Sequence, residues 1–291
     1  MYDMTSCLRV PLAVGAIVFF LATAVTADPI RDAVPPLLDD AGRAGYGEFT
    51  EGALHRAFAI APGGTWVWVS DMPTPEVAES EALRECSNYT DQSCVIFAVD
   101  NQVVFDADAW TGLWGPYIAA GEAAARPVGI RRGERFPDLL LSDPFGAKVK
   151  LSDLRGKAVL FHIWGSWCPP CQVEFPELQM LYESLKGEQG ITFVLVQSRE
   201  DIEKSLRWAK RHGFSMPFYD SGSKGLSDRR FRKADGGTIE DRVLAPQFPS
   251  TYVLDKNGII VFSHSGLLRN WPQYAPFLRH VASRSGGGGA Q

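Results

Sequence analysis

The sequence predicts an α/β protein in which a mixed sheet flanked by helices follows a small α+β domain. In the C-terminal half, apolar segments of strand length alternate with longer helical segments, as in strand–helix–strand units. In the N-terminal half, the expected order within residues 49–110 is strand, strand, helix, strand, strand. A region rich in glycine and proline, 111–133, separates the two parts and is predicted to be a linker.

The composition is that of a globular protein. The 291 residues are enough for two domains, and 45% of them are hydrophobic while 22% are charged. The formal net charge is −5, whereas nucleic-acid-binding domains are usually basic. We therefore expect no nucleic-acid partner, and the sequence indicates no cofactor.

The first 27 residues resemble an export signal. An apolar run at 10–27 follows Arg9 and ends in the small-residue pattern Val25-Thr26-Ala27, which is typical of a signal peptide cleaved after Ala27. The run also approaches the length that spans a bilayer, so an uncleaved anchor is the competing interpretation. Both predict a periplasmic or otherwise exported protein, which meets a membrane only if this segment is kept.

Local signals define the N-terminal part. Residues 28–48, rich in Pro, Asp, Ala and Gly, are expected to form a connecting segment. Thr74 as N-cap and Pro75 at the first helical position predict the start of a helix. The expected elements are strands at 55–62 and 65–71, a helix from Pro75 to Cys86, and a strand pair within 94–105.

The C-terminal part, 134–284, opens with a nearly continuous apolar strand at 157–164, as expected of a strand buried on both faces. A glycine-rich tail at 285–291 should be flexible. The elements expected between them are helices at 170–185 and 200–212, strands at 191–196, 250–255 and 259–264, and a closing helix from near Trp271.

Cysteine counting supports disulfide formation. Removal of residues 1–27 leaves Cys86, Cys94, Cys168 and Cys171, and an even number is what pairing in an exported chain requires. The spacing suggests two local pairs, although sequence alone leaves a crossed connectivity open. Cys86 and Cys94 are expected to form a structural disulfide that closes a small loop. The alternative is a second exchange pair that relays electrons with the other two cysteines.

The Cys168-Pro169-Pro170-Cys171 segment lies where the strand at 157–164 gives way to a helix. Unpaired N–H groups and the dipole at a helix start favour negative charge, which lowers the pKa of a cysteine placed there. Cys168 is therefore the expected nucleophile. Cys171, three residues later on the same helical face, can attack the mixed disulfide and release the reduced partner.

These residues resemble a known family. The segments "LSDLRGKAVLFHIWGSWCPPCQVEFPEL" and "FPSTYVLDKNG" are similar to the thioredoxin fold, specifically to exported TlpA-like reductases, over roughly half the chain. The resemblance implies a thiol-disulfide oxidoreductase that reduces protein disulfides of specific partners, such as factors for cytochrome c or copper-site assembly. A membrane thiol carrier would supply its electrons. An oxidant or isomerase, or a non-catalytic copper-handling or partner-binding protein, remain alternatives of the same fold.

The resemblance also assigns supporting roles. Pro249 occupies the position of a cis-proline that faces the disulfide. The backbone of Phe248 would pair with an extended substrate segment, and Trp167 would cover one side of the site. Glu174 fits the helix pattern of the family and is a candidate for tuning the redox pair, and Pro176 is expected to kink the helix.

His162, six residues before Cys168, departs from the family pattern. Thioredoxins carry a buried Asp at this position, and TlpA-like proteins often an Asn. A histidine there is a candidate proton shuttle to Cys171, since imidazole gains or loses a proton near neutral pH. The alternative is a neutral core histidine hydrogen-bonded to backbone.

Other chemistries have weaker support. A zinc site normally needs four ligands, and the sequence has no second Cys-x-x-Cys; His264 is a lone candidate, so no metal is expected. Peroxiredoxins present Thr-x-x-Cys, where this chain has Gly165-Ser166-Trp167-Cys168.

Two further features have two interpretations each. The basic segment 228–237 is either a solvated loop or a docking site for an acidic partner. Four tryptophans form either an aromatic binding surface or part of the core, namely Trp66, Trp68, Trp110 and Trp114.

Overall fold

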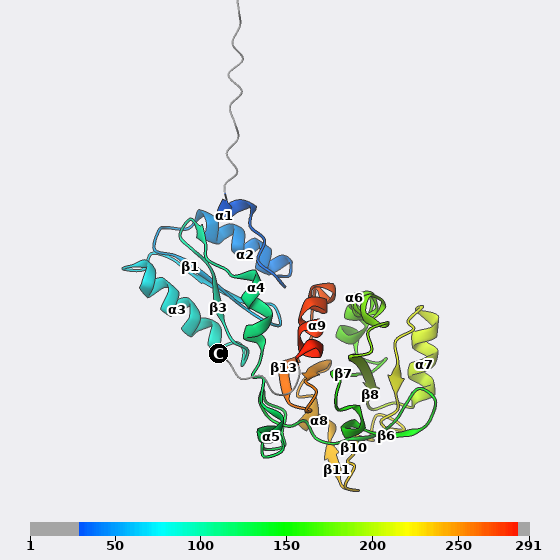
Figure 1. The fold of residues 1–291 in the computed structure, drawn as a ribbon. Coiled ribbons are helices and arrows are strands. Elements are labelled where there is room, and N and C mark those ends of the chain that lie inside the picture. The colour runs from blue at the N-terminus through cyan, green and yellow to red at the C-terminus, as the bar shows by residue number, and fades with distance from the viewer. Residues whose placement is uncertain (1–28, 285–291) are drawn as a thin grey trace, which may run out of the picture.

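The structure, a computed structural model, describes residues 29–284. The signal peptide or anchor predicted at 1–27 and the tail predicted at 285–291 lie outside the described residues. Two larger sheets organise the described part, each with its own helices (Figure 1), and two further sheets have two strands each. None of the helices in 29–284 is long and apolar enough to cross a bilayer.

The first sheet has four antiparallel strands in the order β2-β1-β3-β4. Its strands are β1 (Ala57–Ala61), β2 (Thr65–Val69), β3 (Val95–Val99) and β4 (Gln102–Val103). Helices α2 (Asp40–Glu51) and α3 (Pro75–Ser87) cover its opposite faces (Figure 1). The predicted order of strand, strand, helix, strand, strand is thus present.

Strand β1 packs against both helices, because its side chains alternate between the two faces of the sheet. Phe58 faces α2, where its ring lies 5.1 Å from that of Tyr46. Ala57, Ala59 and Ala61 instead pack with the small residues of α3. Every residue of β1 is therefore buried, with large side chains on one face and a close helix approach on the other.

The segment 28–48, expected to be a simple connection, carries α1 (Pro29–Asp32) and most of α2. The sequence does not predict α2, because the helix contains three glycines and glycine disfavours helix interiors. Tertiary packing overrides this weak propensity, since Tyr46 and Phe49 are buried against the sheet. Asp39 caps the helix by accepting a hydrogen bond from the N–H of Gly42 (2.8 Å).

The region 111–133, expected to be a linker, is largely exposed but contains short helical elements and a few buried residues. It follows α4 (Ala107–Trp110) and contains the 3-10 helix η1 (Thr111–Trp114) and α5 (Ala120–Ala123). Trp114 is 1% exposed, and its ring lies 3.8 Å from that of Phe277 in the C-terminal helix. Trp110 is also buried, while Trp66 and Trp68 pack at the edge of the same core. Trp110 and Trp114 are therefore core residues, while Trp66 and Trp68 are half-buried against the core, and the apolar core is continuous between the two sheets.

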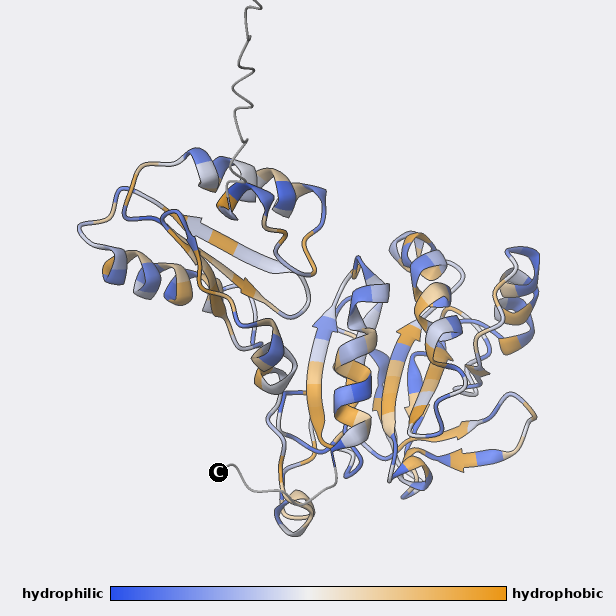
Figure 2. Cartoon of the chain, turned by 45° about the horizontal axis from the view of Figure 1, so that its top comes forward, coloured by the Kyte–Doolittle hydropathy of each residue, from blue (hydrophilic) through white to orange (hydrophobic). Residues whose placement is uncertain are grey.

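The second sheet is mixed, as predicted, with the order β13-β12-β7-β8-β9. Strands β7, β8 and β9 are parallel, and β12 pairs antiparallel with both β7 and β13. Figure 2 shows that apolar residues concentrate in these strands, while the helices around them are mixed. The strands are β7 (Ala158–Trp164), β8 (Ile191–Gln197), β9 (Phe218–Tyr219), β12 (Ser250–Leu254) and β13 (Ile260–Ser265).

Helices α6 and α9 pack on the face of this sheet that carries His162 and Trp164. Phe136 covers the other face, with its ring 4.9 Å from that of Phe161. The helical elements here are α6 (Pro169–Leu185), α7 (Ile202–Arg211), the 3-10 helix η3 (Trp271–Tyr274) and α9 (Ala275–Ser283). Helix α6 runs through Pro176.

Several short elements have no counterpart in the sequence prediction, because elements of two to four residues are too short to show a period. The basic segment 228–237 is part of a hairpin that is anchored by the buried Phe231 and an ion pair between Arg230 and Glu240. The short elements are β5 (Leu140–Ser142), β6 (Lys148–Lys150), η2 (Leu151–Leu154), β10 (Arg230–Arg232), β11 (Thr238–Glu240) and α8 (Asp241–Leu244).

Candidate active site

Cys168 and Cys171 form a disulfide at the N-terminus of α6, with their Cα atoms 5.3 Å apart. Cys168 is the N-cap residue, and its sulfur accepts a hydrogen bond from the N–H of Cys171 (3.3 Å). Pro169 is tolerated at the first helical position because an N–H there has no partner within the helix. Both cysteines are buried, with exposed fractions of 2% for Cys168 and 0% for Cys171.

A buried carboxylate holds the loop before the disulfide. Glu200, at 2% exposure, accepts hydrogen bonds from the backbone N–H (2.6 Å) and the hydroxyl (2.5 Å) of Ser166. Ser205 donates a third bond to it, at 2.7 Å. Glu200 was not predicted as a site residue, since it lies 34 positions after Ser166 and has no local motif. It fixes the turn that carries Trp167 and Cys168.

The second wall of the site is the loop before β12. The peptide bond between Phe248 and Pro249 is cis. Ser250 pairs with Ile163, which brings Pro249 next to the end of β7 where the cysteine loop begins. The rings of Trp167 and Phe248 are 5.0 Å apart, and the Trp167 indole N–H donates to the carbonyl of Ser198 (2.9 Å). The two walls therefore meet through an aromatic pair beside the disulfide.

His162 and Glu174 form a buried pair under the start of α6. His162 Nε2 lies 3.1 Å from Glu174 Oε1, although the two atoms are not aligned as a hydrogen bond. The other ring nitrogen, Nδ1, is 3.0 Å from Oγ1 of Thr251 on β12. The second oxygen of Glu174 accepts the N–H of Leu268 (3.1 Å). Glu174 follows Cys171 by three positions, so both project from the same face of α6.

The second disulfide joins Cys86, at the end of α3, to Cys94, just before β3. It closes a loop that contacts the edge of the other sheet. In this loop the side-chain amide of Gln92 donates to the carbonyl of Ser263 on β13 (3.0 Å), and the Asp91 carbonyl accepts a bond from Arg132 (2.6 Å). The bridge therefore supports a contact between the two sheets.

His264, the candidate metal ligand, lies under a turn of the first sheet. A Cβ atom on Gly63 would be 3.0 Å from its Nδ1, which shows how closely this turn approaches. Burial lowers the pKa of His264, and this effect is opposed by a backbone hydrogen bond at Leu267 and by Asp91. In the part of the chain that the structure describes, no three His, Cys, Asp or Glu side chains are grouped as metal ligands.

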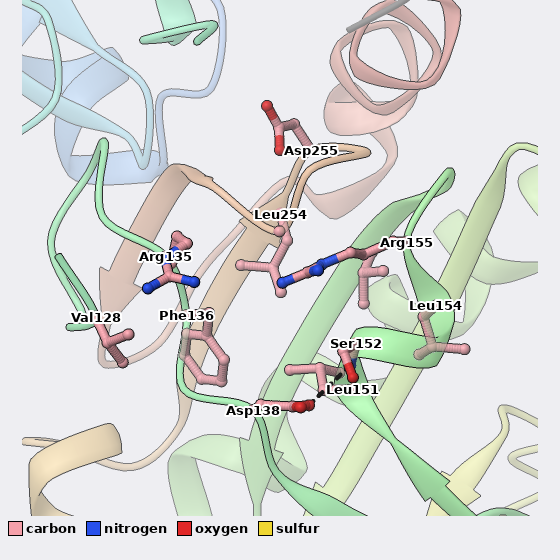
Figure 3. Close-up of a pocket in the computed structure, with 12 residues that line it drawn as sticks. Val128, Arg135, Phe136, Asp138, Leu151, Ser152, Leu154, Arg155, Leu254 and Asp255 are labelled. Carbon is pink, nitrogen blue, oxygen red and sulfur yellow. Dashed lines mark hydrogen bonds between the residues drawn. The ribbon is translucent and has the colours of Figure 1, made fainter. Parts of the chain in front are cut away.

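A small cavity of about 80 Å³ opens at the other end of the second sheet (Figure 3). Arg135, Phe136 and Arg155 are among the residues that line it. Leu254 and Val159, also in its lining, pair at the end of β7 opposite to the disulfide. The cavity is therefore separate from the redox site.

In this mixed sheet, the strand β7 leads into a helix that begins with Cys-x-x-Cys, and a cis-proline loop lies beside it. This arrangement is that of a thioredoxin-like redox protein. The AhpC/TSA family matches residues 132–263. The chain is 31% identical to the thioredoxin-like protein YneN of Bacillus subtilis over 144 residues, which cover 49% of this chain and 76% of YneN. It is 32% identical to the thiol-disulfide oxidoreductase ResA of Halalkalibacterium halodurans over 136 residues, covering 47% and 69%.

Among solved structures, a putative thiol:disulfide interchange protein DsbE from Chlorobium tepidum is 20% identical with a TM-score of 0.42, covering 53% of this chain and all of that one (100%). The similarity to YneN and ResA shows the family of this chain. The chain belongs to the family of thioredoxin-like thiol-disulfide oxidoreductases, and its C-terminal half carries that relationship.

Proposed function

We propose that this oxidoreductase reduces disulfide bonds of specific exported partner proteins, with Cys168 as the nucleophile and Cys171 as the resolving cysteine. The observation that carries the proposal is the Cys168–Cys171 disulfide at the N-terminus of α6, with Cys168 as the helix cap. The helix dipole and the N–H of Cys171 stabilise a thiolate at Cys168. Cys171, which is fully buried, is shielded from competing thiols.

The reaction consists of two exchanges. The Cys168 thiolate attacks one sulfur of the partner disulfide, which forms a mixed disulfide and releases the other partner sulfur as a thiolate. Cys171 then loses its proton and attacks the sulfur of Cys168, which closes the enzyme disulfide and releases the second partner thiol. The partner gains two electrons and two protons. A membrane thiol donor would restore the enzyme dithiol by the reverse sequence.

Phe248, Pro249 and Trp167 form the proposed substrate-binding wall. Within residues 29–284, the backbone N–H and C=O of Phe248 have no hydrogen-bond partner. An extended partner segment could pair with these groups as an added strand. Such pairing would present the partner disulfide to Cys168 beside the aromatic pair.

His162 and Glu174 are proposed to move the proton of Cys171. This cysteine is buried, so its proton needs a buried acceptor when it attacks the mixed disulfide. Glu174 lies on the same helix face, and its contact with His162 provides a second group that can hold a proton. The pairing supports the proton-shuttle interpretation over that of an inert core histidine.

We further propose an exported protein whose 1–27 segment is a cleaved signal or a retained anchor. A disulfide such as Cys86–Cys94 persists only in an oxidising compartment. The division into a disulfide-stapled domain at 49–110, a linker at 111–133 and a redox domain at 134–284 remains a proposal. Limited proteolysis of the purified protein tests it.

The deciding measurement is the equilibrium of Cys168–Cys171 against a glutathione redox series, with Cys86 and Cys94 replaced by alanine to isolate the pair. A reduction potential of about −270 mV would support a reductant, whereas about −120 mV would indicate an oxidant. A Cys171→Ala variant should trap partners as mixed disulfides, and the intact protein should reduce insulin. Stoichiometric metal binding without trapping would instead indicate a copper-handling or other binding protein.

A further inference from the structure

Two arginines flank the aromatic pair beside the disulfide. The guanidinium carbon of Arg199 lies 5.7 Å from the ring centre of Trp167 and 5.1 Å from that of Phe248. Arg242 lies 5.2 Å from the same Phe248 ring. Phe248 is thus approached by two cations at the point where the proposed partner segment would bind.

The charge of Arg199 is already neutralised. Its guanidinium donates two hydrogen bonds to the carboxylate of Asp241 (2.6 and 2.9 Å), which is 0% exposed. The hydroxyl of Ser198 donates to the same carboxylate (3.0 Å). Arg199 also has a positive φ of 60°, uncommon for a side chain of this size. This bidentate pair holds Arg199 in place as a support for the aromatic pair.

Arg242 has no such partner. It is exposed, it donates to the carbonyl of Pro246 (2.8 Å), and no carboxylate among the described residues is within ion-pair distance of it. Arg229 is also exposed, and its backbone carbonyl accepts the N–H of Asp241, the residue before Arg242 (2.7 Å). The chain as a whole has a net charge of −5, so the positive charge of Arg242 beside the aromatic pair is a local feature.

We infer that the partner segment reduced by this protein carries an acidic side chain next to its reactive cysteine, and that Arg242 binds this carboxylate. The inference rests on the proposed function and specifies the substrate class for the same site. A segment paired with the backbone of Phe248 places the residue beside its cysteine close to the Phe248 ring. There, the free N–H groups of Arg242 can donate charge-assisted hydrogen bonds to a carboxylate.

The test uses two synthetic peptides, each with one internal disulfide, that differ only in a glutamate or a glutamine next to the first cysteine. The pre-reduced full chain is mixed with each, and reduced peptide is quantified after an acid quench. The glutamate peptide should react about 2- to 5-fold faster, as expected for one exposed ion pair. The advantage should shrink at high salt.

Variants assign this preference to a residue. Arg242→Gln should bring the ratio of the two rates close to one, and Arg242→Lys should restore part of it because lysine keeps the charge. Arg232→Gln, which removes an exposed arginine from strand β10, is the matched control and should keep the ratio. Equal rates for both peptides, or a preference that survives Arg242→Gln, would overturn the inference while reduction itself still stands. Reduction of neither peptide, together with inactivity on insulin, would instead contradict the proposed function.

Discussion

At the scale of single residues, three ionisable side chains that water barely reaches lie near the redox pair. His162, Glu174 and Glu200 are 0%, 1% and 2% exposed. A buried polar group is costly unless it has partners, so each must be explained by its contacts. Glu200 has three hydrogen bonds and is structural, whereas His162 and Glu174 share a contact that lacks hydrogen-bond alignment.

We predict that His162→Asn slows the resolving step and alters its pH dependence. Asparagine keeps a polar group at this position but cannot take up the proton of Cys171. The loss should be about 100-fold, the lower end of what general acid–base catalysis contributes. Stopped-flow kinetics of thiol exchange across neutral pH measures it. His212→Asn, at an exposed position, is the control, and an unchanged profile in His162→Asn would remove the proton-shuttle role.

We predict that Glu200→Gln destabilises the protein by about 1.5–3 kcal/mol, the range for hydrogen bonds to a charged group. The amide retains one acceptor oxygen, but its NH₂ group would oppose the donors of Ser166 and Ser205. Urea unfolding gives the change in free energy. Glu203→Gln, on the exposed surface of α7, should stay within about 0.5 kcal/mol. Equal effects of the two substitutions would show that the buried network is not responsible.

At the scale of elements, helix α2 shows how close packing can require residues that propensity disfavours. Gly45 lies directly against the ring of Trp66 on β2, where a Cβ atom would come within 2.4 Å of Cζ3. Gly47, two residues later, has nothing within 4 Å of its Cβ position. Alanine is therefore expected to have opposite effects at these two of the three glycines of α2.

We predict that Gly45→Ala destabilises the protein by about 1–3 kcal/mol, because the new methyl group overpacks the contact with Trp66. Gly47→Ala should stabilise it by about 0.5–1 kcal/mol, since alanine favours the helix and meets no neighbour. Thermal and urea unfolding of both variants measure this difference in sign. Stabilisation by both substitutions would mean that α2 is not held against β2 as described.

At the scale of the whole molecule, the two sheets share contacts far from the disulfide. Trp114 joins the core of the first unit to Phe277 of α9. The loop closed by Cys86 and Cys94 contacts the edge strand β13. This contact covers backbone groups of the edge strand that would otherwise be exposed. His264 lies at the same junction, under the turn at Gly63.

We predict that acid weakens this junction through His264. Burial lowers the pKa of His264 in the folded protein below its ordinary value of 6.5, so the unfolded chain takes up this proton first as the pH falls. Stability should therefore decrease as the pH drops from about 7 to 5, and His264→Gln should reduce that decrease. Urea unfolding at several pH values measures it, with His212→Gln as the control. A decrease of the same size in His264→Gln would exclude this histidine as the cause.

Several features were predictable because their signals are local. The strand β7, the helix after Cys168 and the turn-bounded strands β12 and β13 follow from runs of apolar residues and from caps within a few positions. The position of the redox pair at a helix start follows from the same short segment. These signals need no knowledge of which distant segments meet.

The sequence by itself thus determined the fold class of the C-terminal half and the redox pair, since both depend on neighbours along the chain. Only the tertiary structure decided that α2 forms despite its glycines, that Trp114 within 111–133 packs in the core, and that Glu200 holds the cysteine loop. It also paired His162 with Thr251 across 89 positions and brought Arg242 to Phe248. Each depends on burial and on contacts between side chains distant in sequence, which no local pattern encodes.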